Sequence, residues 1–139
     1  MFDFFEAWAE EREVSLRFEG RACWVSGDPL MLRRALSNLL SNAMRYTPKG
    51  QSVTVRVKEA DEQVHIIVEN PGTPIAAEHL PRLFDRFYRV DPSRQRKGEG
   101  SGIGLAIVKS IVAAHQGKVA VTSDTHATRF ILTLPKHAN

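Results

Sequence analysis

The sequence predicts an α+β fold in which helices pack on one face of a mostly antiparallel sheet. Several stretches alternate strictly between apolar and polar residues, which is typical of half-buried strands. Longer stretches carry apolar residues at helical spacing, and the expected order is helix, strands, helix, hairpin, two helices and strands. The chain has 139 residues. At roughly 150 residues per domain, we expect residues 1–139 to form one domain.

The first expected elements are a helix and a pair of short strands. Residues 2–13 carry apolar side chains among acidic ones, which indicates a helix. Residues 14–19 alternate strictly and predict a strand that ends at Gly20. Residues 23–25 are expected to form its partner strand.

A long helix and a hairpin follow. Asp28 and Pro29 are typical of an N-cap and a first helical position, and the helix is expected to run to about Tyr46. Residues 47–50 are expected to end this helix. Valines and isoleucines alternate on either side of residues 60–62, which predicts a β-hairpin. The apolar residues expected on the buried face of the helix are Leu32, Leu36, Leu39, Leu40 and Ala43.

The second half of the chain begins with loops and closes with strands. Residues 70–74 predict a turn-rich loop, and a short helix is expected near residues 77–80. Residues 91–102 are rich in glycine and basic residues and almost lack apolar side chains, which is typical of a mobile functional loop. Two alternating strands, 119–121 and 130–134, come last. The helix before them is expected to bury Ile103, Ile107, Ile111 and Ala114 and to end near Gly117.

Composition excludes several classes of protein. Apolar residues make up 42% and charged residues 25%, as in globular domains. No apolar run approaches the ~20 residues of a membrane span. The single cysteine, Cys23, excludes an internal disulfide and a cysteine-based zinc cluster, and it fits a reducing cytosol. The net charge of +3 permits an anionic ligand but does not predict a nucleic-acid binder.

A first polar cluster lies on the long helix. Asn38 and Asn42 are four residues apart and share a helix face, and Arg34 and Arg45 extend the stripe. Carboxamide oxygens can join a magnesium shell, and arginine pairs with phosphate oxygens. Taken alone, however, the pattern is more typical of a solvated helix face.

Two further clusters follow along the chain. Residues 69–75 lie at a strand end, where a side-chain amide could bind the polar edge of a base and Gly72 would allow close approach. Taken alone, however, this segment is more typical of an ordinary strand-to-helix turn. Residues 98–108 form a glycine-rich loop before a helix, which is typical of a phosphate cradle. A flexible linker has similar composition, and neither a Walker A loop nor a dinucleotide fingerprint fits.

In this order, the three clusters together resemble the catalytic, ATP-binding domain of bacterial sensor histidine kinases. The resemblance spans nearly the whole chain. Residues 66–112 most resemble the copper- and silver-responsive sensor kinases of enteric bacteria, including the silver-responsive kinase. The matching segments are residues 38–48 (N box), 70–75 (G1 box), 83–91 (F box), 100–105 (G2 box) and 128–135 (the strand after the G3 box).

The resemblance implies a Bergerat-type α/β sandwich with a mobile ATP lid, and ATP and Mg²⁺ as cofactors. It implies that Asn42, helped by Asn38, holds magnesium, and that Arg45 lies near the phosphates and Tyr46 beside the nucleotide. It assigns no catalytic side chain to the chain. The nucleotide-binding residues that it implies are Asn38, Asn42, Arg45, Tyr46, Asn70, Gly72, Ile75, Phe87, Arg89, Lys97, Gly98, Gly100, Ser101, Gly102, Ile103, Gly104, Leu105 and Thr128.

The chain departs from the family pattern at three places. Asn70 replaces the aspartate that accepts from the adenine amino group, and a neutral acceptor is weaker than a charged one. Pro74 replaces the second glycine of the G1 box. Residues 125–127, in the G3 region, lack the usual glycines. These departures bear on ATP affinity more than on the fold.

The resemblance also implies partners and a location. The chain would be the cytoplasmic, ATP-binding part of a longer inner-membrane sensor kinase that forms a homodimer, with this part itself monomeric. It would deliver the γ-phosphate to a histidine on a separate dimerisation domain, and a cytoplasmic response regulator would be a further partner. None of the five histidines has the His-Glu-x-x-x-Pro-like context of a phospho-acceptor, so the chain alone is not expected to phosphorylate itself. Glu69 is expected to be held by the backbone at a strand end, rather than to act as a general base.

Two other functions fit the sequence less well. Gyrase, Hsp90 and mismatch-repair proteins share the ATP fold, but they hydrolyse ATP with a helix carboxylate four residues before the magnesium asparagine. That position is Asn38 here, which cannot act as a base. A nucleic-acid-binding module using Arg94, Arg96 and Lys97 is not expected, because the net charge is low and no aromatic residues interleave the basic run.

Overall fold

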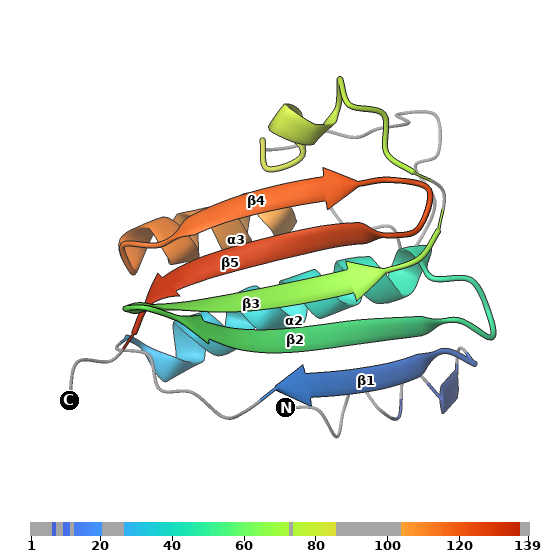
Figure 1. Ribbon diagram of the computed structural model, residues 1–139, viewed down its shortest axis with the longest axis horizontal. Coiled ribbons are helices and arrows are strands. Elements are labelled where there is room, and N and C mark those ends of the chain that lie inside the picture. Colours follow the sequence, from blue (N-terminus) through green and yellow to red (C-terminus); the bar gives the residue numbers. More distant parts are fainter. Residues whose placement is uncertain are drawn as a thin grey trace.

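The computed structural model describes residues 7, 10–11, 13–20, 27–72, 74–85 and 104–136. Five strands form one sheet in the order β1-β2-β3-β5-β4 (Figure 1). β1 runs parallel to β2, and the other three neighbouring pairs are antiparallel, so the expected mostly antiparallel sheet is confirmed. The strands are β1 (Ser15–Gly20), β2 (Ser52–Ala60), β3 (Gln63–Asn70), β4 (Lys118–Ser123) and β5 (Thr128–Pro135).

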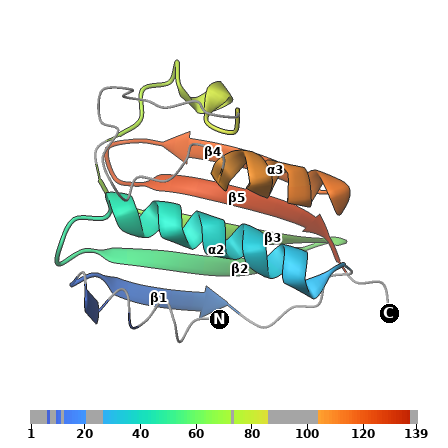
Figure 2. The same cartoon turned by 180° about the vertical axis from the view of Figure 1, so that it is seen from behind.

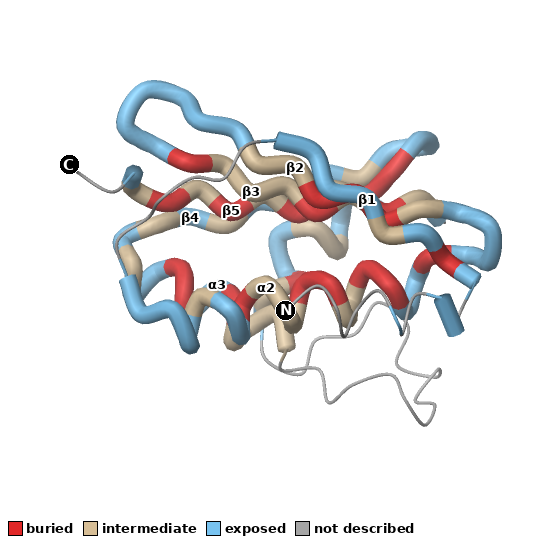
Figure 3. Tube along the Cα trace, turned by 90° about the horizontal axis from the view of Figure 1, so that it is seen from below, coloured by how far each residue is buried: buried red, intermediate tan, exposed pale blue. Residues whose placement is uncertain are grey.

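Two helices, α2 (Pro29–Tyr46) and α3 (Gly104–Ala114), cover one face of the sheet (Figures 2 and 3). The opposite face carries no helix among the described residues. The structure is thus a two-layer sandwich, with its hydrophobic core between the helices and the sheet. Within that core, the largest fully buried side chains are Phe130, Leu39, Leu40, Met44 and Leu132.

Both ends of α2 lie where the sequence predicts. Asp28 Oδ1 accepts from the backbone N–H groups of Leu30 at 2.9 Å and Met31 at 3.3 Å, as an N-cap does. At the other end, Thr47 Oγ1 donates to Ala43 O at 2.7 Å. The expected face is confirmed, with Leu39, Leu40 and Ala43 buried and Leu32 and Leu36 partly buried.

The buried face of α3 differs from the expected one. Ile111 is buried as predicted, but Ala114 is exposed and the face centres on Val108 and Val112. The reason is that α3 packs against α2 as well as against β4 and β5, and this rotates the helix toward residues 108 and 112. Ile103 lies outside the described residues.

The short helix after β3 also differs. It is a 3₁₀ helix over Leu80–Arg82, not an α-helix over residues 77–80. An α-helix that began at Ala77 would need Pro81 to donate a backbone bond to Ala77 O, and proline has no N–H. The observed bonds are of the tighter i to i−3 type, such as Arg82 N to His79 O at 3.0 Å.

Other expected segments are described only in part. In the predicted helix over residues 2–13, residues 7, 10 and 11 are described as helical. The predicted partner strand at residues 23–25 and the predicted loop at residues 91–102 lie outside the described residues.

Gly117 lies after α3, as expected. The residue with positive φ is Gln116, at 63°, so Gly117 does not supply a left-handed conformation. Instead, a Cβ at Gly117 would lie 2.4 Å from Thr133 O and 2.8 Å from Val112 Cγ1. The glycine therefore permits the close approach of the chain to β5 as it turns into β4.

We predict that Gly117→Ala lowers the free energy of unfolding by about 1–3 kcal/mol, because its methyl group overlaps a backbone carbonyl. Urea denaturation followed by circular dichroism measures this. The control is Gly104→Ala, where no described atom lies within 4 Å of a new Cβ. Equal stability of the two variants would contradict the steric role of Gly117.

Candidate functional site

Segments far apart in the sequence meet at one edge of the sandwich. β3 and β4 end, and β5 begins, on the side where α2 ends (Figure 1). α3 begins beside the middle of α2, because Asn38 Nδ2 donates to Gly104 O at 3.2 Å. The N, G1 and G2 boxes thus lie next to one another.

The α2 side of this site carries the two predicted carboxamides. Asn38 and Asn42 are both half-buried and one helical turn apart. The Asn38 amide nitrogen is bonded to the start of α3, which leaves its Oδ1 to accept or to coordinate. Arg45 and Tyr46, at the end of the helix, are exposed.

The donor set fits a magnesium ion that is shared with phosphate groups. Among the residues that the structure describes, no three His, Cys, Asp or Glu side chains cluster to hold a metal. Magnesium commonly takes one or two protein oxygens and completes its shell with water and substrate phosphate oxygens. The carboxamide oxygens of Asn38 and Asn42 can supply such a partial shell.

Asn70 lies at the end of β3 and is buried, with 6% relative exposure. Its Nδ2 donates to Pro71 O at 3.0 Å, so its Oδ1 is the atom left to accept from a ligand. Gly72 follows with φ of 141°, and a Cβ there would lie 3.0 Å from Tyr46 O. This glycine lets the loop after β3 approach the end of α2.

Hydroxyl groups link the same loop to the β4–β5 end. Ile75 N donates to Ser123 Oγ at 2.8 Å, and Ser123 Oγ lies 2.8 Å from Thr128 Oγ1. Thr128 is buried and is paired with Asn70 in the sheet. Sequence reasoning included Thr128 and missed Ser123. The alternation of β4, which turns residues 119, 121 and 123 inward, is the signal that could have found it.

The β4–β5 turn closes without glycine. Asp124 Oδ1 accepts from the backbone N–H of His126 at 2.8 Å and of Ala127 at 3.0 Å. These bonds, first from Ala127 and then from His126, lower the pKa of the exposed Asp124 carboxyl. Residues 124–127 are all described, and none has positive φ. An Asx-type turn therefore replaces the glycines that the G3 region usually carries.

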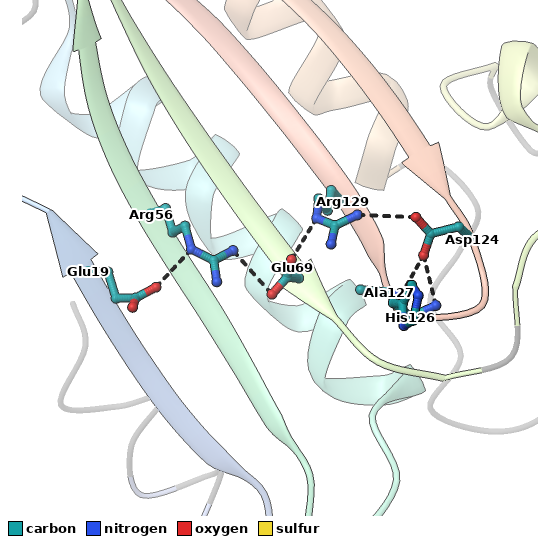
Figure 4. A network of polar contacts seen from close by, with 7 residues as sticks. All are labelled: Glu19, Arg56, Glu69, Asp124, His126, Ala127 and Arg129. Atoms are coloured by element: carbon teal, nitrogen blue, oxygen red, sulfur yellow. Dashed lines mark hydrogen bonds and ion pairs between the residues drawn. The ribbon is translucent and has the colours of Figure 1, made fainter.

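Glu69 lies next to Asn70 but on the opposite, helix-free face of the sheet (Figure 4). Its Oε1 accepts from Arg129 Nε at 2.6 Å, and its Oε2 lies 3.1 Å from Arg56 Nη1. Arg56 also bonds Glu19, and Arg129 pairs with Asp124. The expectation that the backbone holds this carboxylate was wrong, because two arginines do so.

These arginines determine the charge state of Glu69. Partial burial alone would raise the pKa of the carboxyl, but the hydrogen bonds and charges of Arg56 and Arg129 outweigh it, so the pKa is lowered. A carboxylate held ionised between two cations is a poor proton acceptor. Its position on the far face of the sheet also removes it from the candidate site.

Two of the histidines, His65 and His115, have hydrogen-bond partners within the chain. His65 Nδ1 lies 3.0 Å from Thr133 Oγ1. His115 Nε2 accepts from Asp28 N at 3.0 Å, and its Nδ1 lies 2.8 Å from Ile111 O, which ties the end of α3 to the start of α2. The described part of the chain contains no helix that is both long and apolar enough to cross a membrane.

The remaining predicted site residues divide into two groups. Leu105 packs against the hydrophobic core, directly after Gly104. The predicted site residues that lie outside the described part of the chain are Phe87, Arg89, Lys97, Gly98, Gly100, Ser101, Gly102 and Ile103.

Comparison with known sequences places the chain in a family. The model of the "Histidine kinase-, DNA gyrase B-, and HSP90-like ATPase" family matches residues 27–138. The chain is 76% identical over 135 residues to the sensor histidine kinase CusS of Escherichia coli (strain K12), covering 97% of this chain and 28% of CusS. It is 67% identical over 121 residues to the probable sensor kinase SilS of Salmonella typhimurium, covering 87% of this chain and 24% of SilS. The chain thus spans only about a quarter of the length of these relatives.

Solved structures agree with this placement. The mycobacterial sensor histidine kinase MprB superposes with a TM-score of 0.85 at 29% identity, over 99% of this chain and 94% of that one. The catalytic domain of histidine kinase ThkA superposes with a TM-score of 0.84 at 25% identity, over 97% and 87% of the two chains.

The chain belongs to the histidine kinase-, DNA gyrase B- and HSP90-like ATPase family. Its similarity to sensor kinases over nearly its whole length identifies it as an ATP-binding catalytic domain of the sensor histidine kinase type. The Bergerat-type sandwich and the family inferred from the motifs are therefore confirmed.

We predict that Glu69→Gln lowers the free energy of unfolding by about 1–2 kcal/mol near neutral pH, because two charge-assisted hydrogen bonds lose their anion. The folded-state pKa of Glu69 is lowered, so this contribution is present above the unfolded-state pKa. It disappears as the pH falls through the folded-state pKa. Urea denaturation in steps from about pH 7 to about pH 3 should therefore show the variant and the unmodified chain converging in acid.

The control for this measurement is Glu62→Gln, in the exposed β2–β3 turn. It should differ little from the unmodified chain at any pH. A stability difference for Glu69→Gln that stays constant down to the lowest pH would contradict the ionic role of Glu69.

Proposed function

We propose that this chain binds Mg-ATP and presents the γ-phosphate to a histidine on a separate domain of a heavy-metal-responsive sensor kinase. The observation that carries the proposal is the convergence of α2, the loop after β3 and the start of α3. The Asn38–Gly104 hydrogen bond and the approach of Gly72 to Tyr46 O create it. A magnesium-binding helix, a base acceptor and a helix N-terminus are the groups that a nucleoside triphosphate requires.

In this proposal, Asn42 and Asn38 hold magnesium, Arg45 pairs with phosphate and Tyr46 lies beside the nucleotide. Asn70 accepts from the adenine amino group. The other residues that we propose for nucleotide binding are Gly72, Ile75, Phe87, Arg89, Lys97, Gly98, Gly100, Ser101, Gly102, Ile103, Gly104, Leu105 and Thr128.

Catalysis would consist of positioning and charge neutralisation, as in phosphoryl transfer generally. When bound, magnesium would neutralise charge on the phosphate oxygens. The carboxamides of α2 orient the triphosphate, and backbone N–H groups at the start of α3 contribute positive partial charge. We assign the role of general base to none of the described side chains.

An alternative function, that of an ATP-gated ATPase like gyrase or Hsp90, is less well supported. Its hydrolytic carboxylate would occupy position 38. There, Asn38 donates to Gly104 O instead. A carboxamide cannot take a proton from water, so ATP bound here would persist until an acceptor histidine is supplied.

The partners and the location follow from the same proposal. The acceptor histidine would come from the dimerisation domain of a homodimeric, inner-membrane kinase, and the phosphoryl group would pass to a cytoplasmic response regulator. Residues 1–139 would form one cytoplasmic domain, monomeric by itself and with no role in binding nucleic acid. The resemblance of residues 66–112 to copper- and silver-responsive kinases makes these metals the proposed signals.

We predict that Asn42→Ala weakens nucleotide binding in the presence of magnesium by at least about tenfold, or ~1.4 kcal/mol. Calorimetric titration with a non-hydrolysable ATP analogue, with magnesium and with a chelator, measures this. Asn42 is only half-buried, beside the face that buries Leu39, so the fold should survive. The neighbouring substitution Ser41→Ala is the control. If Asn42→Ala unfolds the chain or binds normally, the magnesium role is wrong.

We predict that the 139-residue chain alone remains unlabelled by γ-labelled ATP, because no histidine has a phospho-acceptor context. Adding the dimerisation domain of the same kinase should yield acid-labile label on that domain, measured by autoradiography of gels. Acid-labile label on the isolated chain, or steady release of phosphate without an acceptor, would favour a different activity.

A further inference from the structure

We propose that Ser123 is a positioning residue that orients the Thr128 hydroxyl and thereby makes the site select adenine over guanine. The inference rests on the proposed function, because it assumes that Asn70 and Thr128 face the base of a bound nucleotide. The resemblance to the family assigns no role to Ser123. Its role follows from the hydrogen-bonding groups that meet at the end of β4.

The Ser123 hydroxyl lies between a backbone amide and a second hydroxyl. Ile75 N–H donates to Ser123 Oγ at 2.8 Å, and Ser123 Oγ lies 2.8 Å from Thr128 Oγ1. Thr128 has 6% relative exposure, and the sheet pairs it with both Ser123 and Asn70. One hydroxyl therefore connects the loop after β3 to the residue that lies beside Asn70.

The backbone amide favours one of the two directions in which the Ser123 and Thr128 hydroxyls can share a proton. An N–H can only donate, so Ser123 Oγ accepts from Ile75. When Ser123 in turn donates to Thr128 Oγ1, each group donates to the next, and such rows of hydrogen bonds strengthen one another. The proton of Thr128 is then the one left for a ligand.

Asn70 is oriented by a fixed backbone group as well. Its Nδ2 donates to Pro71 O at 3.0 Å, so its Oδ1 is left to accept. The site therefore offers an acceptor next to a donor. The adenine edge is complementary, with an amino N–H and a ring nitrogen acceptor, whereas guanine presents a carbonyl and a ring N–H.

Without the Ser123 hydroxyl, no hydrogen bond from residue 123 would hold the Thr128 hydroxyl in one orientation. The Thr128 hydroxyl could then rotate to accept as easily as it donates. Guanine would then meet one mismatched group instead of two, so the difference between the affinities for ATP and GTP would shrink. The loss would appear in the ratio of the two affinities rather than in overall binding.

The test is calorimetric titration of the 139-residue chain with Mg-ATP and Mg-GTP. The unmodified chain is compared with Ser123→Ala, with Ser123→Thr, which keeps the hydroxyl, and with Thr122→Ala. Thr122 lies on the same strand but is exposed on the other face. We expect Ser123→Ala to lower the ratio of ATP to GTP affinity by roughly three- to tenfold. Ser123→Thr and Thr122→Ala should keep the ratio of the unmodified chain.

An unchanged ratio in Ser123→Ala would overturn the inference, even if both affinities fall together, because parallel loss is what structural damage produces. A lowered ratio of ATP to GTP affinity in Ser123→Thr would also overturn the inference. An unmodified chain that binds ATP without preference over GTP overturns the inference alone. An unmodified chain that binds neither nucleotide overturns the proposed function, and the inference with it.

Discussion

The packing of α2 against the sheet is the interaction on which the candidate site depends. Residues 35, 39 and 43 form a row at helical spacing and are completely buried. Asn38 and Asn42 form the adjacent row, about 100° around the helix. Because residues 35, 39 and 43 are fixed by burial, the direction in which Asn38 and Asn42 point is fixed as well. Each large buried side chain of α2 is worth about 2–5 kcal/mol, so the carboxamides are held by far more free energy than their own bonds provide.

Strand alternation imposes a second constraint, which separates two chemically different neighbours. Glu69 points to the helix-free face, between Arg56 and Arg129, whereas Asn70 is buried beside Thr128. A carboxylate at position 70 would therefore be shielded from Glu69 by the sheet and by two cations. It would instead place an oxygen against Pro71 O, where Asn70 now donates. The local backbone, rather than the acidic neighbour, is the feature that favours an amide here.

The elements that follow from periodicity could be predicted from the sequence. The Asp28 cap, the span of α2 and the β2–β3 hairpin each depend on residues close in the chain, and each lies where it was expected. The buried face of α3 could not be predicted in the same way, because it depends on contacts with both α2 and the sheet. For the candidate site, the motifs supplied the proposed residues. Ser123 lies outside every motif, and its importance depends on a bond to Ile75, 48 residues away.

The neutral acceptor that we propose for the base, Asn70, changes what the rest of the site has to provide. A carboxylate accepts hydrogen bonds in any orientation and binds strongly through charge, whereas an amide accepts only at its oxygen. A site that uses Asn70 must therefore gain its selectivity from orientation. The Pro71 carbonyl accepts from the amide, and Ile75 N–H donates to Ser123, whose hydroxyl lies 2.8 Å from that of Thr128. The Asp124 turn, which closes without glycine, holds Ser123 and Thr128 opposite each other. If Asn70 binds the base as proposed, the departures at Asn70 and in the G3 region act together, because hydrogen bonds to fixed backbone groups replace the contribution of charge.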